Sequence, residues 1–112
     1  MKLPNANLCR VDREKITDYL LNREHPDNGG EADFFIGLGF QADDWKTCAA
    51  ALRSLAQQSS VSQSLESKHG KKYIVDGLIE TPIGKTPMVR TIWIVDSGEI
   101  APRLVTAYPC EA

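Results

Sequence analysis

Two histidines are the side chains of this chain that could move protons near neutral pH, because the unperturbed pKa of imidazole lies there. His25 and His69 are therefore candidates for general acid or base chemistry, such as phosphodiester cleavage. His25 also precedes Pro26, and a residue before proline tends to end a helix, so a purely local role stays open. One histidine flanked by Glu24 and Asp27 lacks the spaced further ligands of a metal site. We expect no metal and no cofactor.

Cationic side chains gather between two predicted strands, at Lys68, His69, Lys71 and Lys72. Lysine side chains neutralise backbone phosphates when proteins bind nucleic acid. The same residues could instead keep a hairpin tip hydrated and block pairing at a sheet edge. The cluster is thus a candidate substrate-binding site, and its alternative is a solvated loop.

The composition is that of an ordinary soluble globular protein. The 112 residues are 42% hydrophobic and carry a formal net charge of −2. This charge disfavours a strongly basic nucleic-acid-binding protein but permits a local basic patch. No apolar run approaches the roughly 20 residues of a membrane span, and the first residues lack a signal-peptide core. We expect one cytoplasmic domain over residues 1–112, without membrane contact.

The first half of the chain is predicted to be helical. Ile16, Tyr19 and Leu20 recur at helical spacing, and Trp45 and Leu52 belong to a longer apolar stripe of the same period. The predicted helices span residues 12–22, 31–38 and 42–57.

The second half changes to β-branched residues, alternating polarity and Gly/Pro punctuation. The predicted strands span residues 61–67, 72–80, 87–95 and 102–108. Their short connections require antiparallel neighbours, and the apolar, proline-free third strand should be central. The sequence thus predicts an α+β fold, with three N-terminal helices packed on one face of a four-stranded antiparallel sheet.

A sheet covered by helices on one side leaves its other face open, and strand alternation sorts the side chains between the two. We expect Ile92 and Ile94 to meet the helices. The residues then expected on the open face are Thr91, Trp93, Thr106 and Tyr108. Their alternative role is packing, because threonine and aromatic side chains suit a pleated sheet in any case.

The order of segments resembles a family of small bacterial domains of unknown function, found alone or at the C-terminal ends of polymorphic toxins. The resemblance covers nearly the whole chain. Its carriers include Leu3-Pro4-Asn5-Ala6, residues 18–22, His25-Pro26, residues 70–77, residues 90–95 and the closing string from Pro102 to Pro109. Helices followed by a sheet are also similar to the barnase, EndoU, colicin and RelE group of metal-independent ribonucleases.

This resemblance implies RNA cleavage at the open face, with RNA and a cognate immunity or antitoxin protein as partners. It implies that His25 is the acid or base and that Arg90 or Arg103 clamps a phosphate. Positioning groups would be Thr91, Thr106 and Tyr108, and Trp93 would join the cationic hairpin in binding substrate. The rival hypothesis is a non-catalytic module that binds a protein through the open face or a sheet edge. The sequence leaves the oligomeric state open.

One loop departs from the pattern expected of the family. Asn28, Glu31 and Asp33 stand where a glycine, a lysine and a basic residue are expected. These residues make a plausible phosphate-binding loop acidic. Either the lysine is not catalytic in the family, or this member is weakened or inactive.

Overall fold

The second half of the chain forms a four-stranded antiparallel sheet in the order β1-β2-β3-β4. The strands are β1 (Val61–Ser67), β2 (Gly70–Leu78), β3 (Met88–Asp96) and β4 (Arg103–Pro109). The computed structural model describes residues 1–28 and 30–110. It confirms an α+β fold with the predicted antiparallel sheet, and β3 lies inside the sheet rather than at its edge.

The helical half differs from the prediction. Two α-helices, α1 (Glu31–Gly37) and α2 (Trp45–Gln58), lie in the middle of the chain. Residues 1–28, all described by the structure, hold only a 3-10 turn, η1 (Ala6–Leu8), and a π-helical turn, η2 (Lys15–Leu20). A second 3-10 turn, η3 (Ala42–Asp44), precedes α2. The expectation of three N-terminal helices is therefore wrong.

The π-helical turn has a physical reason in its packing. The Leu21 amide donates to the Ile16 carbonyl over 2.9 Å, which widens the turn by one residue. Ile16 and Leu20 are 0% exposed, whereas Tyr19 between them points toward β4. A short segment gains little from helix propagation, so these tertiary contacts decide its geometry.

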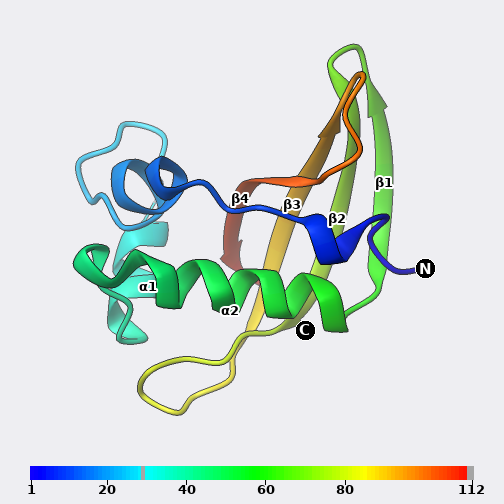
Figure 1. Cartoon of the computed structure of the whole chain (residues 1–112). Helices are drawn as coiled ribbons and strands as arrows, with labels where there is room; N and C mark the ends of the chain where they lie inside the picture. Colours follow the sequence, from blue (N-terminus) through cyan, green and yellow to red (C-terminus); the bar gives the residue numbers. More distant parts are fainter. Residues whose placement is uncertain (29, 111–112) are drawn as a thin grey trace.

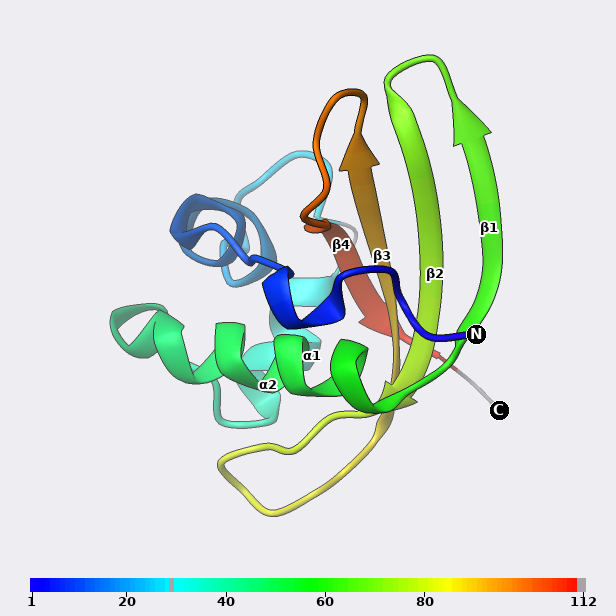
Figure 2. The ribbon, with the colours of Figure 1, turned by 45° about the vertical axis from the view of Figure 1, so that its right-hand side comes forward.

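Helices and sheet form two layers. Figure 1 shows α2 lying across one side of the strands, and Figure 2 shows α1, α2 and the N-terminal turns on that same side. The core between the layers contains Phe35, Leu52, Val75, Val89 and Trp93, each 0% exposed. Within the part of the chain that the structure describes, the opposite face of the sheet therefore carries no α-helix.

The N-terminal segment continues the sheet at the β4 edge. The Arg10 amide donates to the Pro102 carbonyl and the Leu104 amide donates to the Arg10 carbonyl, over 2.9 and 3.1 Å. This short parallel bridge between Arg10 and Arg103 places η2 beside β4. Side chains of η2 can therefore reach residues on β4.

Gly77 of β2 lets α2 approach the sheet closely. A Cβ at this position would lie 2.2 Å from Ser59 Oγ and 3.1 Å from Leu55 Cγ. We expect Gly77→Ala to lower the free energy of unfolding by about 1–3 kcal/mol, the usual cost of overpacking, measured by urea denaturation. Gly37→Ala is the matched control, because nothing lies within 4 Å of its Cβ position. Equal stability of the two variants would contradict the close approach.

Candidate functional site

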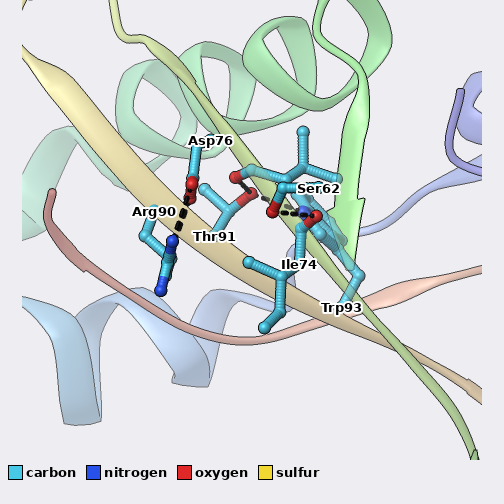
Figure 3. Close-up of polar contacts among 7 residues, drawn as sticks. Ser62, Ile74, Asp76, Arg90, Thr91 and Trp93 are labelled. Carbon is cyan, nitrogen blue, oxygen red and sulfur yellow. Dashed lines mark hydrogen bonds and ion pairs between the residues drawn. The ribbon is translucent and has the colours of Figure 1, made fainter. Parts of the chain in front are cut away.

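Thr91 and Trp93 lie in the core, on the helix-covered face of β3. Both are 0% exposed. Trp93 Nε1 donates to Thr91 Oγ1 over 2.8 Å, and this hydroxyl donates to the Val75 carbonyl over 2.7 Å (Figure 3). The expectation that they face the open side is wrong. The indole gains most from burial, whereas the charge of Arg90 on the other side of the strand must stay hydrated.

The open face carries an arginine–carboxylate pair across β2 and β3. Arg90 stands opposite Asp76 in the sheet register and donates from Nε and Nη2 to the two carboxylate oxygens, each over 2.8 Å (Figure 3). Tyr108 stands opposite Arg90 on β4. The hydrogen bonds and charge of Asp76, with a smaller contribution from the Tyr108 hydroxyl, raise the pKa of Arg90. The guanidinium is thus a permanent cation on the helix-free face.

A second set of contacts links the open face to Tyr19 of η2 and to His25 in the loop that follows η2. The hydroxyls of Tyr19 and Thr106 share a hydrogen bond of 2.9 Å. Thr106 stands opposite Ile92, so it shares a face with the Arg90–Tyr108 pair. The His25 ring meets the Tyr19 ring edge-on, with 5.0 Å between centroids. Thr106, Tyr108 and Arg90 therefore share one side of β4 and β3, and His25 is joined to Thr106 through the Tyr19 ring.

The hydrogen bonding of His25 limits what its ring can do. The Asp27 amide donates to His25 Nδ1 over 3.1 Å, so Nδ1 is the unprotonated nitrogen of the neutral ring. Nε2 then carries the hydrogen. In this tautomer the ring can donate a hydrogen bond from Nε2. His25 can therefore donate a hydrogen bond to an anion, and its role as an acid or base stays a prediction.

Arg103 lies apart from Arg90, near the other end of β3. Its Nε and Nη2 donate to the two carboxylate oxygens of Asp96 over 2.7 and 3.0 Å. The hydrogen bond from Arg103 holds the pKa of Asp96 below its ordinary value. Arg103 faces the same side as Arg90, because it stands opposite Ile94. The two arginines thus mark two places on one face rather than one clamp.

The cationic hairpin between β1 and β2 does not gather its charges at one point. Lys68 and His69 are exposed at the turn. Lys71 and Lys72 are successive residues of β2 and therefore project to opposite faces. Lys71 lies 3.7 Å from Glu66 and stands over the Tyr73 ring.

The three residues that depart from the family pattern have local structural partners. Asn28 is 3% exposed; its Nδ2 donates to the Tyr19 carbonyl and its Oδ1 accepts from the Ala32 amide at the beginning of α1. Asp33 pairs with Arg23 on the surface. Glu31 Oε2 is a buried atom without a hydrogen-bond partner among the described residues. Asn28 therefore supports Tyr19 and α1, and the charge of Asp33 is matched locally.

A groove of about 670 Å³ lies elsewhere, between α2 and the connection of β2 to β3. Its lining includes Asp44, Ala51 and Glu80 but none of the predicted site residues. Within residues 1–28 and 30–110, no group of three or more His, Cys, Asp or Glu side chains could hold a metal ion. In the same part of the chain, no helix combines the length and the apolar character of a transmembrane span.

Sequence reasoning missed Asp76 and Tyr19. Asp76 and Arg90 are equally distant in the sequence from Ile83, which lies between the predicted strands 72–80 and 87–95. A hairpin centred at Ile83 places Asp76 and Arg90 opposite each other, so the sequence did contain a signal for this pair. Tyr19 and Thr106 are 87 positions apart, and no local pattern indicates their contact.

Fold and site together define an α+β domain with helices on one side of an antiparallel sheet and a polar patch on the other. The chain belongs to the family described as domain of unknown function DUF6883, whose model matches residues 2–111. This confirms the expected membership in a domain family of unknown function.

A solved structure shares this fold. It is a chain of a contact-dependent growth inhibition toxin–immunity protein complex from Klebsiella pneumoniae 342, with a TM-score of 0.75 and 20% sequence identity. The similarity covers 96% of the present chain and 97% of the other. No curated protein sequence matches the chain.

Proposed function

We propose that this domain is a metal-independent ribonuclease of a toxin–immunity system, with its site on the helix-free face of the sheet. The observation that carries the proposal is the Asp76–Arg90–Tyr108 row across β2, β3 and β4. It combines a carboxylate, a permanent cation and a hydroxyl within one side-chain layer. These are groups that phosphodiester cleavage without a metal requires.

In this proposal Asp76 is the general base. It takes the proton of the ribose 2′-hydroxyl while the 2′-oxygen attacks the adjacent phosphorus. The bond from phosphorus to the 5′-oxygen breaks, and that oxygen takes a proton from solvent at the open face. The products are a 2′,3′-cyclic phosphate and a 5′-hydroxyl end. Arg90 stabilises the negative charge that grows on the phosphate oxygens.

The other polar groups bind and orient the strand. Asp76 engages the Nε and Nη2 nitrogens of Arg90, so the carboxylate does not occupy Nη1, which can meet a phosphate oxygen. His25 Nε2–H donates to the phosphate, in keeping with the bond at its Nδ1. Tyr108 and Thr106 position the strand from β4. Thr91 and Trp93 have no direct part, because they are buried.

The toxin–immunity context rests on the shared fold. The similar solved chain comes from a complex of a growth inhibition toxin with its immunity protein. A ribonuclease that inhibits growth requires an inhibitor in the cell that makes it, and a protein that covers the open face would exclude RNA from it. The proposed partners are therefore RNA as substrate and a cognate protein as inhibitor.

Controlled expression and RNA cleavage test the proposal together. We expect induced expression in a bacterial host to arrest growth, and we expect the purified chain to cleave total RNA in excess EDTA and to leave cyclic phosphate ends. Arg90→Gln should abolish both effects, whereas Lys46→Gln on α2 should retain both. Normal growth together with intact RNA at micromolar protein would overturn the assignment.

The alternative is a binding module without catalysis, and one observation favours it. The edge strand β1 is exposed at every residue except Val61, and Leu65 and Leu78 are 47% and 58% exposed. A partner strand could add to this edge. Intact RNA, combined with tight binding of the product of an adjacent gene that Leu65→Lys weakens, would establish this alternative.

A further inference from the structure

Lys15 is a cation beside the β4 edge of the sheet that the sequence did not single out. It is the first residue of η2, and its Nζ lies 5.0 Å from the centroid of the Tyr19 ring. The hydroxyl of that ring is bonded to Thr106 on β4. Lys15 therefore lies at the β4 border of the site, held by the same tyrosine that joins His25 to the sheet.

Arg103 lies on the same strand as Thr106 and faces the same side of the sheet, so two cations flank this border. Burial lowers the pKa of Lys15, the nearby positive charge of Arg103 lowers it further, and Asp12 opposes the shift. The carboxylates around them are already engaged, because Asp12 lies 3.3 Å from Arg10 and Asp96 binds Arg103 in two hydrogen bonds. Asp96 engages Nε and Nη2 of Arg103 and does not occupy Nη1, so this nitrogen and the Lys15 ammonium can both donate to a phosphate oxygen.

We propose that Lys15 and Arg103, with the Thr106 hydroxyl, form a second phosphate-binding subsite for a single-stranded RNA. The subsite binds a phosphate next to the one that Arg90 holds for cleavage. The choice of an RNA strand as the ligand rests on the proposed function, whereas the positions of Lys15, Arg103 and Thr106 do not. The arginines at two places along one face then have a common purpose, since successive phosphates of one strand pass from Arg90 toward Arg103. Lys15 is a binding residue here, not a catalytic one.

The salt dependence of binding to a short DNA oligonucleotide tests this subsite. DNA lacks the 2′-hydroxyl, so it binds without being cleaved. Each phosphate contact to a single strand contributes about 0.7 to the slope of log K against log salt concentration. We expect Lys15→Gln to reduce this slope by about 0.7 and to weaken binding roughly fivefold at 0.1 M salt, as read by fluorescence anisotropy. Lys15→Arg should keep the slope, because it keeps the charge.

Lys46→Gln is the matched control, since Lys46 is an exposed lysine on α2 and should leave the slope unchanged. A Lys15→Gln slope equal to that of the unmodified chain overturns the subsite, as does an equal reduction by both variants. Binding of inorganic phosphate in calorimetry, with no binding of the oligonucleotide, identifies a free-anion site and overturns the RNA assignment. Lys15-dependent DNA binding in a chain that leaves RNA intact supports the subsite but rejects the ribonuclease proposal. RNA cleavage by the unmodified chain, together with an unaltered salt slope in Lys15→Gln, supports the ribonuclease proposal but rejects the subsite.

Discussion

Trp93→Ala is expected to lower the free energy of unfolding by about 3–5 kcal/mol, the usual cost of emptying a large buried aromatic site. The indole is 0% exposed between the sheet and the helices. Its removal also takes the Nε1 donor from Thr91 Oγ1, a hydroxyl buried at 0% exposure. Because small domains have about 5–15 kcal/mol in total, this loss removes a large share of the stability. Urea denaturation followed by circular dichroism measures it.

Two further variants separate packing from a role in the site. Trp93→Phe retains most of the ring volume and should cost less than Trp93→Ala. Trp45→Ala on α2 is the second control, because Trp45 is only partly buried and should also cost less. A stable Trp93→Ala chain that has lost RNA binding would contradict a packing role and would show that Trp93 contacts the substrate.

The sheet could be predicted because its signals are local. Alternating β-branched residues and glycine-containing connections placed all four strands within about two residues of their observed bounds, which is the usual uncertainty of such boundaries. The short connections also determined the antiparallel neighbours. Residues 12–22 did not become an α-helix, because the bridge of Arg10 to β4 and the burial of Ile16 decide their geometry.

The orientation of β3 was predicted wrongly for a physical reason. The prediction oriented β3 by placing the apolar Ile92 against the helices, although the charged Arg90 lies on the same side of the strand. A single guanidinium costs more to bury than an isoleucine gains, so the charged residue should have decided which side meets water. With that choice, Arg90 falls on the open face, where Tyr108 was already expected, and Trp93 falls in the core. The contact of Tyr19 with Thr106 could not be foreseen, because it depends on where η2 lies beside β4.

Asp76→Asn is expected to reduce RNA cleavage in EDTA by about 100-fold or more, the usual contribution of a general base. Asparagine has nearly the same shape and still offers one oxygen to Arg90, so the chain should remain folded. It cannot accept the 2′-hydroxyl proton. Binding of a short DNA oligonucleotide should persist or tighten, because a negative charge beside the phosphate is removed. Initial cleavage rates and anisotropy on the same preparation measure both effects.

Asp96→Asn is the matched control, since Asp96 holds Arg103 as Asp76 holds Arg90. Both carboxylates receive two hydrogen bonds from their arginine, and their side chains are exposed to 31% and 22%. Loss of either carboxylate removes the same charge from the same face of the sheet. A large loss of cleavage in Asp76→Asn alone therefore identifies a base, because charge and packing change alike in the two variants. Equal losses of cleavage in the two variants would assign both arginine–carboxylate pairs to RNA binding. Unchanged cleavage in Asp76→Asn would show that Asp76 is not the general base.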